Sequence, residues 1–507
     1  MTALLVRGAQ ILTMARGQTG AFAGDMLVRD GRIETIGQGI EPPDGAEIIE
    51  GRGRLLMPGL VNAHTHSSET FFRGRYEKMP LEIWLLYAYP FFDNRPVPPR
   101  LLYLRTLLLA MESLKSGVTM LSDDFFETPG HDLDRLGLVF DAYDHAGIRA
   151  NISSAVMNVP ALDALPYARE IVPRDLAARL DAFTPISVQA CLEFCERVFS
   201  RLHSRANGRL RFMLAPSAPQ RCTPELMTAL HALSRRHGVP YHTHVLETKT
   251  QAVTGPDLYG RSLIHYFADL GLLGPNMVIA HSVWVSDADI ALMGEAGVAV
   301  AHNAVSNLKL GAGIAPVRRL LDAGVAVGLG TDGLSSNDTA RIFDVMRVAA
   351  LVQSATGPDP QDWLSAREIL QAATLGGART ALLDRVTGSL EAGKAADFIL
   401  LDMGSTSFLP FNDVEKHLVY AENGGSVETV VVDGKIVMRD RKLLTVDEDA
   451  VLAEIAETVP PLLAEHARVE AQNRVLEPFM QEIHRRATAQ DIGMQRYAGD
   501  MPSWRHG

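Results

Sequence analysis

The amino-acid sequence predicts an α/β protein, a (β/α)₈ barrel of the TIM type with a small β-sandwich domain formed by both chain termini. Three observations predict this fold. The chain has 507 residues, which is enough for a barrel core and a satellite domain. Its middle alternates short apolar runs with amphipathic segments. Similar hairpin patterns stand near its two ends.

The two terminal hairpins share one plan, in which an Asp-Gly pair separates two apolar runs. The first reads MLVRDGRIETIG over residues 26–37, and the second reads TVVVDGKIVMRD over residues 429–440. Asp-Gly in this setting is a strong hairpin signal, and an isolated hairpin is at best marginally stable. We therefore expect residues 1–56 and 386–445 to form one β domain, with residues 57–385 inserted as the barrel.

Eight apolar runs in the middle of the chain are predicted to be the barrel strands. They cover residues 54–64, 117–124, 148–156, 210–217, 239–245, 276–283, 298–303 and 325–332. Helical patterns lie between most of them, and eight strand–helix units in series indicate a closed barrel. An open doubly wound sheet is the alternative.

Two segments fall outside this scheme. Residues 67–100 follow the first barrel strand and are rich in aromatic side chains, and long loops at this face of a barrel usually have a function. Residues 446–507 form a C-terminal extension that looks helical and then polar. The extension could pack on the barrel, form an oligomer contact or fray.

The composition is that of an ordinary globular protein, with 47% hydrophobic and 21% charged residues. A net charge of −12 argues against nucleic-acid and anionic-membrane partners. The sequence shows neither a signal-peptide pattern nor an apolar run of about eighteen residues. We therefore expect a cytoplasmic enzyme with a small-molecule substrate and with no nucleic-acid or membrane partner.

Histidines and acids gather at the carboxyl ends of four predicted strands, where barrel enzymes place their chemistry. These residues are His64, His66, His244, Glu247, His281 and Asp332.

Strand geometry allows several of these side chains to reach one metal ion. Residues i and i+2 of a strand point to the same face, so His64 and His66 can both reach the barrel mouth. With His244 and Asp332 they would form a nitrogen-rich site that suits Zn²⁺ or Fe²⁺ better than Ca²⁺ or Mg²⁺. Such a metal lowers the pKa of bound water from 15.7 to about 7. Glu247 could then pass a proton to a leaving group.

Six motifs between about residues 55 and 402 carry a family resemblance. They are PGLVNAHTH, HVLET, VIAHSV, AHNAVSNLKLGAGIAPV, VGLGTDG and GSLEAGKAADFILLD. On these motifs the chain resembles the amidohydrolase superfamily, and within it the branch of adenosine-type, guanine and 8-oxoguanine deaminases and triazine hydrolases. The motifs are specific for the superfamily and the branch, and they say little about the substrate.

The resemblance implies a mononuclear metal site. The implied metal ligands are His64, His66, His244 and Asp332. It also implies that Asp332 takes a proton from the water, that Glu247 shuttles a proton to the leaving nitrogen, and that His281 positions the attacking hydroxide. A binuclear relative would need a bridging lysine after the fourth run, which reads LRFMLAPSAP and has none. We expect one divalent metal ion per chain, zinc first and iron as the alternative, in a homo-oligomer.

Substrate contacts are predicted at Trp84, Ser217 and Asn307. Adenosine-type deaminases of this branch usually have Pro-His after the fourth strand, and here the pair is Pro216-Ser217. This departure weakens a nucleoside assignment and is closer to the guanine-derivative and triazine enzymes. Trp84 lies in the 67–100 loop, and Asn307 lies in the AHNAVSN motif.

The His-Thr-His triplet occurs twice, and its two copies are predicted to differ. In the second copy, His242 lies two residues before the ligand His244, roughly 6.6 Å further down the strand. We therefore expect His242 to lie in the packed layers below the metal.

These features predict hydrolytic deamination of an amino-substituted N-heterocycle of the purine, pterin or triazine type, with release of ammonia. The alternative is hydrolysis of another C–N or C–Cl bond, in an alkylamino- or chloro-triazine, a urea, a carbamate or an amide. A non-catalytic scaffold is disfavoured because every predicted site position is intact. Cytidine-type zinc deaminases are excluded because the sequence contains no PCxxC pattern.

Overall fold

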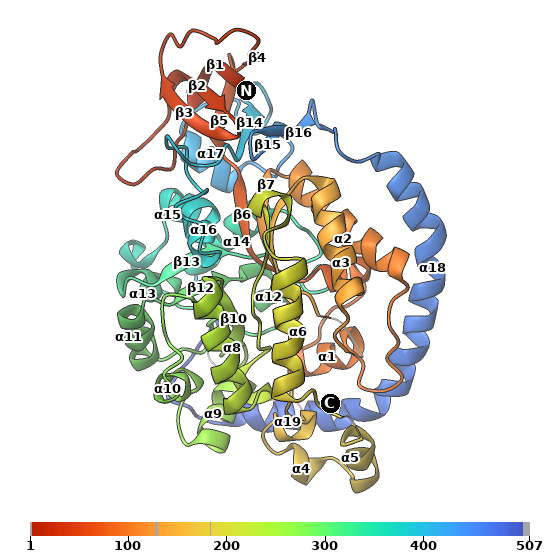
Figure 1. Ribbon diagram of the computed structural model, residues 1–507. Helices are drawn as coiled ribbons and strands as arrows, with labels where there is room; N and C mark the ends of the chain where they lie inside the picture. Colours follow the sequence, from red (N-terminus) through yellow and green to blue (C-terminus); the bar gives the residue numbers. More distant parts are fainter. Residues whose placement is uncertain (1–2, 127–129, 183, 500–507) are drawn as a thin grey trace.

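The computed structural model of the chain describes residues 3–126, 130–182 and 184–499. Eight short parallel strands form a barrel in its middle (Figure 1). They are β6 (Leu60–Thr65), β7 (Val118–Asp123), β8 (Arg149–Ile152), β9 (Leu210–Phe212), β10 (Tyr241–Val245), β11 (Met277–His281), β12 (Ala299–His302) and β13 (Ala326–Leu329). All but three of their 37 residues are buried, as is usual for parallel strands that helices cover.

The barrel closes at the two junctions between its halves, β6-β7-β8-β9 and β10-β11-β12-β13. Between β9 and β10, Leu214 and Tyr241 form a parallel bridge, and the His242 N–H donates to the Leu214 carbonyl at 2.8 Å. Between β13 and β6, the Asp332 N–H donates to the His64 carbonyl at 2.9 Å. The expected closed barrel is therefore confirmed, and two of the predicted metal ligands meet at its seam.

Helices follow the barrel strands and cover the outside of the barrel (Figure 1). The helices between and after the strands are α2 (Pro99–Lys115), α3 (Leu133–Ala146), α6 (Val188–Arg201), α8 (Pro224–His237), α9 (Lys249–Tyr259), α10 (Leu263–Asp269), α11 (Asp287–Ala296), α12 (Ala304–Lys309), α13 (Val317–Asp322) and α14 (Ile342–Gln353). Several begin at a side-chain cap, such as Thr223 before α8 and Ser286 before α11. These caps fix where each strand-to-helix loop ends.

Strands from both ends of the chain pair in one sheet of nine strands. They are β1 (Ala3–Ile11), β2 (Phe22–Arg29), β3 (Arg32–Gly37), β4 (Glu47–Glu50), β5 (Arg54–Pro58), β14 (Phe398–Asp402), β15 (Val427–Val432), β16 (Lys435–Arg439) and β17 (Lys442–Leu443). Strand β5 pairs with β1 in parallel and with β14 in antiparallel orientation, so it joins the two ends of the chain. We call these strands the terminal sheet.

Both expected hairpins are present in the terminal sheet. The turn between β2 and β3 places Asp30 and Gly31 at φ 48° and 80°, and the turn between β15 and β16 places Asp433 and Gly434 at φ 51° and 75°. Positive φ at both central residues is the conformation for which Asp-Gly is selected in tight hairpins. The Asp-Gly signal was therefore sufficient to locate both turns.

The first predicted barrel run, residues 54–64, is not one strand. It divides into β5 of the terminal sheet and β6 of the barrel, with Gly59 between them. A Cβ atom on Gly59 would lie 2.1 Å from the Thr119 side chain on β7, so only glycine allows the chain to pass this close. The apolar pattern continues across the junction because both strands are buried, which is why the run looked continuous.

The C-terminal extension packs against the barrel and the 67–100 segment. It contains the long helix α18 (Glu448–Asn473) and α19 (Glu477–Ala489), which run down one side and under the molecule in Figure 1. Helix α18 contacts α2 and α1 (Leu81–Ala88), and α19 contacts α1 and α9. Within the 67–100 segment, a 3₁₀ turn over Ser67–Phe72 precedes α1.

The remaining helices are short. They are α4 (Ala168–Ile171), α5 (Arg174–Leu180), α7 (Arg205–Gly208), α15 (Ala366–Gln371), α16 (Gly377–Thr380) and α17 (Val414–Tyr420). Among the described residues, no helix is long and apolar enough to span a membrane.

Candidate active site

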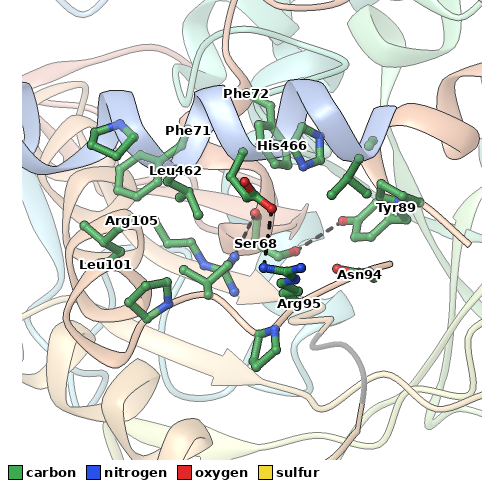
Figure 2. A pocket seen from close by; sticks show the side chains of 18 of the residues that line it. Ser68, Phe71, Phe72, Tyr89, Asn94, Arg95, Leu101, Arg105, Leu462 and His466 are labelled. Carbon is green, nitrogen blue, oxygen red and sulfur yellow. Dashed lines mark hydrogen bonds and ion pairs between the residues drawn. The ribbon is translucent and has the colours of Figure 1, made fainter. Parts of the chain in front are cut away.

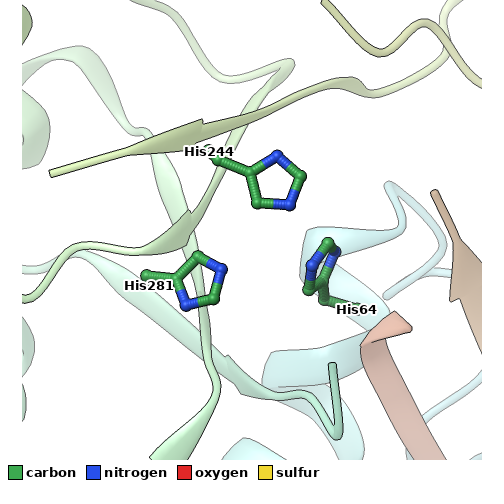
Figure 3. Close-up of side chains that lie close together, drawn as sticks. All are labelled: His64, His244 and His281. Atoms are coloured by element: carbon green, nitrogen blue, oxygen red, sulfur yellow. The ribbon is translucent and has the colours of Figure 1, made fainter. Parts of the chain in front are cut away.

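The carboxyl ends of the barrel strands bring the predicted metal-site residues together. Ligand atoms of His64, His66 and Asp332 lie within 4.8 Å of one another, and so do those of His64, His244 and His281. Figure 3 shows the three imidazoles of the second group facing one another across the barrel mouth. A third group joins Glu247 to His281 and Asp332 within the same limit.

Each imidazole of the cluster has its Nδ1 atom held by an acceptor. The acceptors are Nε2 of His242 for His64 at 2.8 Å, the Asp124 carbonyl for His66 at 2.6 Å, the Ser217 carbonyl for His244 at 2.8 Å, and Oδ1 of Asn307 for His281 at 2.8 Å. These contacts leave the four Nε2 atoms available to the centre of the cluster. A hydrogen bond at the outer nitrogen that fixes the tautomer and the ring orientation is typical of metal-ligating histidines.

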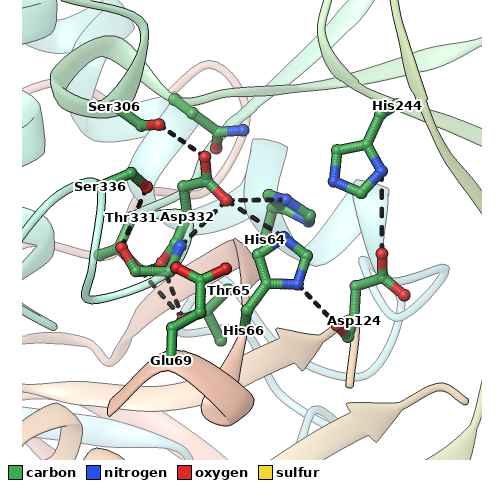
Figure 4. A network of polar contacts seen from close by, with 12 residues as sticks. His64, Thr65, His66, Glu69, Asp124, His244, Ser306, Thr331, Asp332 and Ser336 are labelled. Atoms are coloured by element: carbon green, nitrogen blue, oxygen red, sulfur yellow. Dashed lines mark hydrogen bonds and ion pairs between the residues drawn. The ribbon is translucent and has the colours of Figure 1, made fainter. Parts of the chain in front are cut away.

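Asp332 completes the cluster from the last strand. Its Oδ1 atom lies 3.3 Å from Nε2 of His64 and 3.2 Å from Nε2 of His66. The Ser306 hydroxyl donates to its Oδ2 atom at 2.6 Å (Figure 4). Its close contacts with His64 and His66 outweigh burial and hold the pKa of this carboxyl well below its usual range. Asp332 is therefore an ionised carboxylate that faces several imidazoles.

Strained backbone at the strand ends aims these side chains into the mouth. His281 has φ 75° and Asp332 has φ 62°, in the left-handed region that residues other than glycine rarely adopt. Such strain persists where the surrounding structure imposes it, and it is frequent at functional sites.

Burial shifts the pKa values of several cluster residues. It lowers the pKa of His64 to about 4 and the pKa of His244 well below the usual histidine range. Both rings are therefore neutral near pH 7, which is the form that binds a metal ion. Burial has the opposite effect on Glu247 and raises its pKa to about 7, with His281 acting against the rise. A carboxyl group with a pKa near neutrality can both accept and donate a proton.

The donor atoms fit a divalent metal ion. Nε2 of His64 is buried and makes no hydrogen bond among the described residues, although polar atoms in protein interiors are usually satisfied. It lies at the centre of the cluster, beside a carboxylate and other imidazole nitrogens. A nitrogen-rich set with one carboxylate suits Zn²⁺ or Fe²⁺.

The predicted substrate residues have different surroundings. Trp84 and Ser217 line a small cavity of about 90 Å³ that reaches His66, His244, Glu247, His281 and Asp332. Asn307 is not among the residues that line this cavity. Its contact with His281 places it behind that ring, where it holds Nδ1.

His242 is buried and stands in direct contact with the cluster. Its exposed fraction is 1%, and it is stacked on His64, with the ring centroids 4.9 Å apart. It belongs to none of the groups of potential metal ligands found in the described part of the chain. His242 therefore supports a cluster residue from one layer below.

The structure adds residues that the sequence motifs did not identify. Asp124 follows β7, and one of its carboxylate oxygens lies 3.8 Å from Nδ1 of His244 (Figure 4). Glu69 is buried at the cavity wall, where it accepts hydrogen bonds from Tyr89 at 2.6 Å and Ser335 at 2.5 Å. Arg221 also lines the cavity. Asp124 could have been found as the acid that ends the second apolar run, whereas the sequence gives no comparable signal for the other two.

A second and larger cavity of about 450 Å³ adjoins the first (Figure 2). It lies between the 67–100 segment and α18, and its lining is mainly apolar. Tyr89 and Phe126 line both cavities. Arg105 in its wall donates to the Ser68 carbonyl at 3.2 Å. No group of potential metal ligands occurs there among the described residues.

Known proteins resemble this chain over almost all of its length. A sequence profile of the amidohydrolase family matches residues 55–437. A 5'-deoxyadenosine deaminase of Methanosarcina mazei is 33% identical over 466 residues, which cover 92% of this chain and 99% of that protein. A 5-methylthioadenosine/S-adenosylhomocysteine deaminase of Desulforudis audaxviator is 37% identical over 463 residues, which cover 91% and 99%.

Solved structures show the same architecture. An atrazine chlorohydrolase from Arthrobacter aurescens, in complex with zinc, has a TM-score of 0.81 at 26% identity and covers 90% of this chain and 100% of its own. An adenosine deaminase from Xanthomonas campestris with bound zinc has a TM-score of 0.77 at 26% identity and covers 94% and 99%. Because these structures cover 90% and 94% of this chain, the likeness extends beyond the barrel.

Proposed function

Because the chain belongs to the amidohydrolase family, we propose that it is a metal-dependent aminohydrolase that removes an amino group from an N-heterocycle by hydrolysis and releases ammonia. The observation that carries this proposal is the cluster at the barrel mouth. Four imidazoles present their Nε2 atoms to one centre, beside the ionised Asp332 and a carboxyl group, Glu247, whose pKa is about 7.

We assign the metal-ligand role to four residues of the cluster. They are His64, His66, His244 and Asp332. A divalent metal held there, zinc first and iron as the alternative, supplies a nucleophilic oxygen at neutral pH by lowering the pKa of water to about 7. One metal ion per chain is proposed, because the segment after β9 has no lysine to bridge a second ion. The zinc-bound neighbours support the choice of zinc.

The remaining residues are assigned to proton transfer and orientation. Of the two protons of the attacking water, Glu247 accepts one and delivers it to the ring nitrogen, and the second passes through Asp332 to the amine, which leaves as ammonia. His281, whose Nδ1 is held by Asn307, directs Nε2 toward Glu247 at 3.7 Å and toward Asp332 at 3.9 Å. From there it can hydrogen-bond the oxygen that attacks. Asp332 is proposed to take up a proton from the attacking water.

The substrate is proposed to be an amino-substituted N-heterocycle, since the similar deaminases act on adenine nucleosides or their derivatives. Ser217 stands where adenosine-type enzymes of this branch usually have histidine, which favours a ring other than a nucleoside. The cavity of about 90 Å³ is also below the roughly 300–1,000 Å³ that is typical of ligand pockets, which favours a small ring. Trp84 at the wall would contact that ring.

A second candidate is hydrolysis of another C–N or C–Cl bond. The structural likeness to the atrazine chlorohydrolase favours it. Glu247 favours an amine, because an amine must be protonated before it leaves, whereas chloride need not be.

Organisation beyond the site is proposed from the sequence. The barrel domain is assigned to residues 57–385, the β domain to residues 1–56 and 386–445, and the helical extension to residues 446–507. A cytoplasmic homo-oligomer is the proposed state of the enzyme.

The test is an ammonia-release screen of the zinc-loaded protein against purines, pterins, pyrimidines, triazines and ureas. Ammonia from at least one amino-substituted ring, in equal amount to the oxo product, is the expected result. Release of chloride or alkylamine without ammonia would favour the second candidate. Silence across the whole panel would contradict deamination.

A further inference from the structure

Arg221 is the one arginine, beside three histidines, among the described residues that line the cavity at the cluster. It ends the 3₁₀ turn Pro219–Arg221, which follows β9. Its N–H donates to the Ala218 carbonyl at 3.0 Å, and its own carbonyl accepts from the N–H groups of Asn158 at 3.0 Å and Val159 at 3.1 Å. The backbone of this residue is therefore fixed on both sides, and the guanidinium is presented from a rigid turn.

The Arg221 guanidinium has few partners for a partly buried cation. Its one hydrogen bond among the described residues runs from Nη1 to the Ser217 hydroxyl at 3.3 Å. No carboxylate of the described chain lies within 4.0 Å of it. Burial lowers its pKa, and the charges of Glu247 and Glu82 oppose that shift from a greater distance. A cation that leaves water without a close anion is destabilising, and a guanidinium has five N–H donors to satisfy.

The surroundings of Arg221 connect it directly to the reaction centre. Ser217, which accepts its hydrogen bond, also offers its carbonyl to Nδ1 of His244 at 2.8 Å. A second donor in the cavity lining is free as well, because Nε1 of Trp84 is buried and has no hydrogen-bond partner among the described residues. Two donors with few acceptors therefore line this cavity. Its other walls include apolar side chains and carboxyl groups, namely Leu81, Met157, Leu310, Glu69, Asp124, Glu247 and Asp332.

We infer that Arg221 selects the substrate by binding a negatively charged group, a carboxylate, on the heterocycle. This inference rests on the proposed function, because it concerns which amino-substituted ring the same site accepts. A carboxylate matches the planar fork of a guanidinium and can accept two parallel hydrogen bonds from it. The carboxylate is not consumed in the reaction; it orients the ring, so that the carbon bearing the amino group faces the metal and Glu247.

The inference distinguishes this chain from enzymes of neutral nucleosides. The small volume of the cavity and Ser217 in place of histidine point in the same direction, toward a compact ring that is recognised by charge. Arg221 is accordingly a recognition residue and takes no part in proton transfer.

The test compares aminopyrimidine carboxylates with the matching carboxamides, which have nearly the same shape and no charge. Binding to the zinc-loaded enzyme is measured by calorimetry, and turnover is measured by ammonia release. The wild-type enzyme is expected to prefer the carboxylates by about 10- to 100-fold, the range for hydrogen bonds to charged groups. Equal binding of the two members of each pair would overturn the inference.

Three variants identify the residue responsible. Arg221→Met should abolish the preference, while Arg221→Lys should retain part of it, because lysine keeps the charge but not the fork. Arg235→Met is the matched control, since Arg235 is exposed at the end of α8, and it should behave as wild type. Zinc content and the thermal midpoint report whether each variant is folded. A preference that survives in folded Arg221→Met would also overturn the inference.

Binding and turnover separate this inference from the proposed function. If carboxylates bind through Arg221 and no substrate releases ammonia, the recognition role stands and the deaminase assignment fails. If carboxamides and other neutral rings are deaminated as well as carboxylates, the deaminase assignment stands and the role of Arg221 fails.

Discussion

At the scale of single residues, the site is organised by the hydrogen bonds that hold the outer nitrogens of its imidazoles. Each imidazole has Nδ1 held by an acceptor, so that Nε2 is presented to the centre. Rings held in this way bind a metal ion with less loss of side-chain freedom than mobile rings would. His242 and Asn307 are therefore as much a part of the site as the residues that they orient.

Glu247→Gln tests the proton shuttle. The amide keeps the size of the side chain but cannot accept a proton, so kcat should fall by about 10²- to 10⁴-fold, the usual contribution of general acid–base catalysis. Zinc content should not change. Glu225→Gln is the control, because Glu225 is exposed on α8. A kcat near that of the wild type would remove Glu247 from the mechanism.

His242→Phe tests the support of His64. Burial holds the pKa of His242 well below its usual range, so its ring is neutral and its Nε2 can accept a hydrogen bond from Nδ1–H of His64. Phenylalanine removes this acceptor, and the zinc affinity should fall by about 10- to 100-fold. The same substitution at His265, a partly exposed residue remote from the cluster, should leave the affinity unchanged. An unchanged zinc Kd in a folded His242→Phe variant would refute the supporting role.

At the scale of elements, the strands were predictable and the loops were not. Apolar runs located all eight barrel strands, and period-two geometry placed His64 and His66 on one face. The residues that the sequence missed, Glu69 and Arg221, lie on short 3₁₀ turns after the strands, where no apolar run marks which side chains face the cavity. The substrate contact of Asn307 stays a prediction, and its observed contact is with Nδ1 of His281.

The 67–100 segment is attached to α18 by contacts between residues far apart in the sequence, which no local sequence pattern predicts. Arg75 donates to the two carboxylate oxygens of Glu470 at 2.7 and 2.6 Å, and Tyr76 donates to the same carboxylate at 2.8 Å. Burial acts to raise the pKa of Glu470. Hydrogen bonds from His466, Arg75 and Tyr76 outweigh this effect and lower the pKa to about 2. This carboxylate therefore ties the aromatic segment at the cavity to the C-terminal extension.

Glu470→Gln should lower the free energy of unfolding by about 1–3 kcal/mol near pH 7, because it replaces charged hydrogen bonds by neutral ones. The folded-state pKa is below the unfolded value of 4.5, so the advantage of the wild type is present above pH 4.5 and is lost as the pH falls toward 2. Denaturant unfolding at several pH values measures this difference.

Glu457→Gln, at an exposed position of the same helix, is the control for that experiment. It should have no effect at any pH. A Glu470→Gln difference that is constant from pH 7 to pH 3 would contradict the assigned role of the carboxylate.

At the scale of the whole molecule, a buried ion pair joins the barrel to the terminal sheet. Arg149 on β8 contacts Asp397 at 2.9 and 3.1 Å and Asp433 in the β15–β16 turn at 3.1 Å. The side chains of Arg149 and Asp397 are 4% and 0% exposed. The Asp-Gly turn that the sequence predicted as a hairpin thus also contributes a charge to the domain contact, which no local pattern could reveal.

Arg149→Met should lower the free energy of unfolding by about 3–5 kcal/mol, because it leaves the Asp397 carboxylate buried without its partner. Arg54→Met is the matched control, since it removes the partly exposed pair between Arg54 and Glu428 within the terminal sheet. That change should cost about 1 kcal/mol or less. Equal losses in the two variants, measured by denaturant unfolding, would contradict a special role for the buried pair.

The central claim is that one metal ion per chain supports hydrolysis at the barrel mouth. The most direct test adds zinc stepwise to the metal-free enzyme while ammonia release is followed with a substrate found in the screen. Activity should be absent without metal, rise in proportion to the zinc added, and reach its plateau at one equivalent per chain. Activity in the metal-free enzyme, or a plateau only at two equivalents, would contradict the claim.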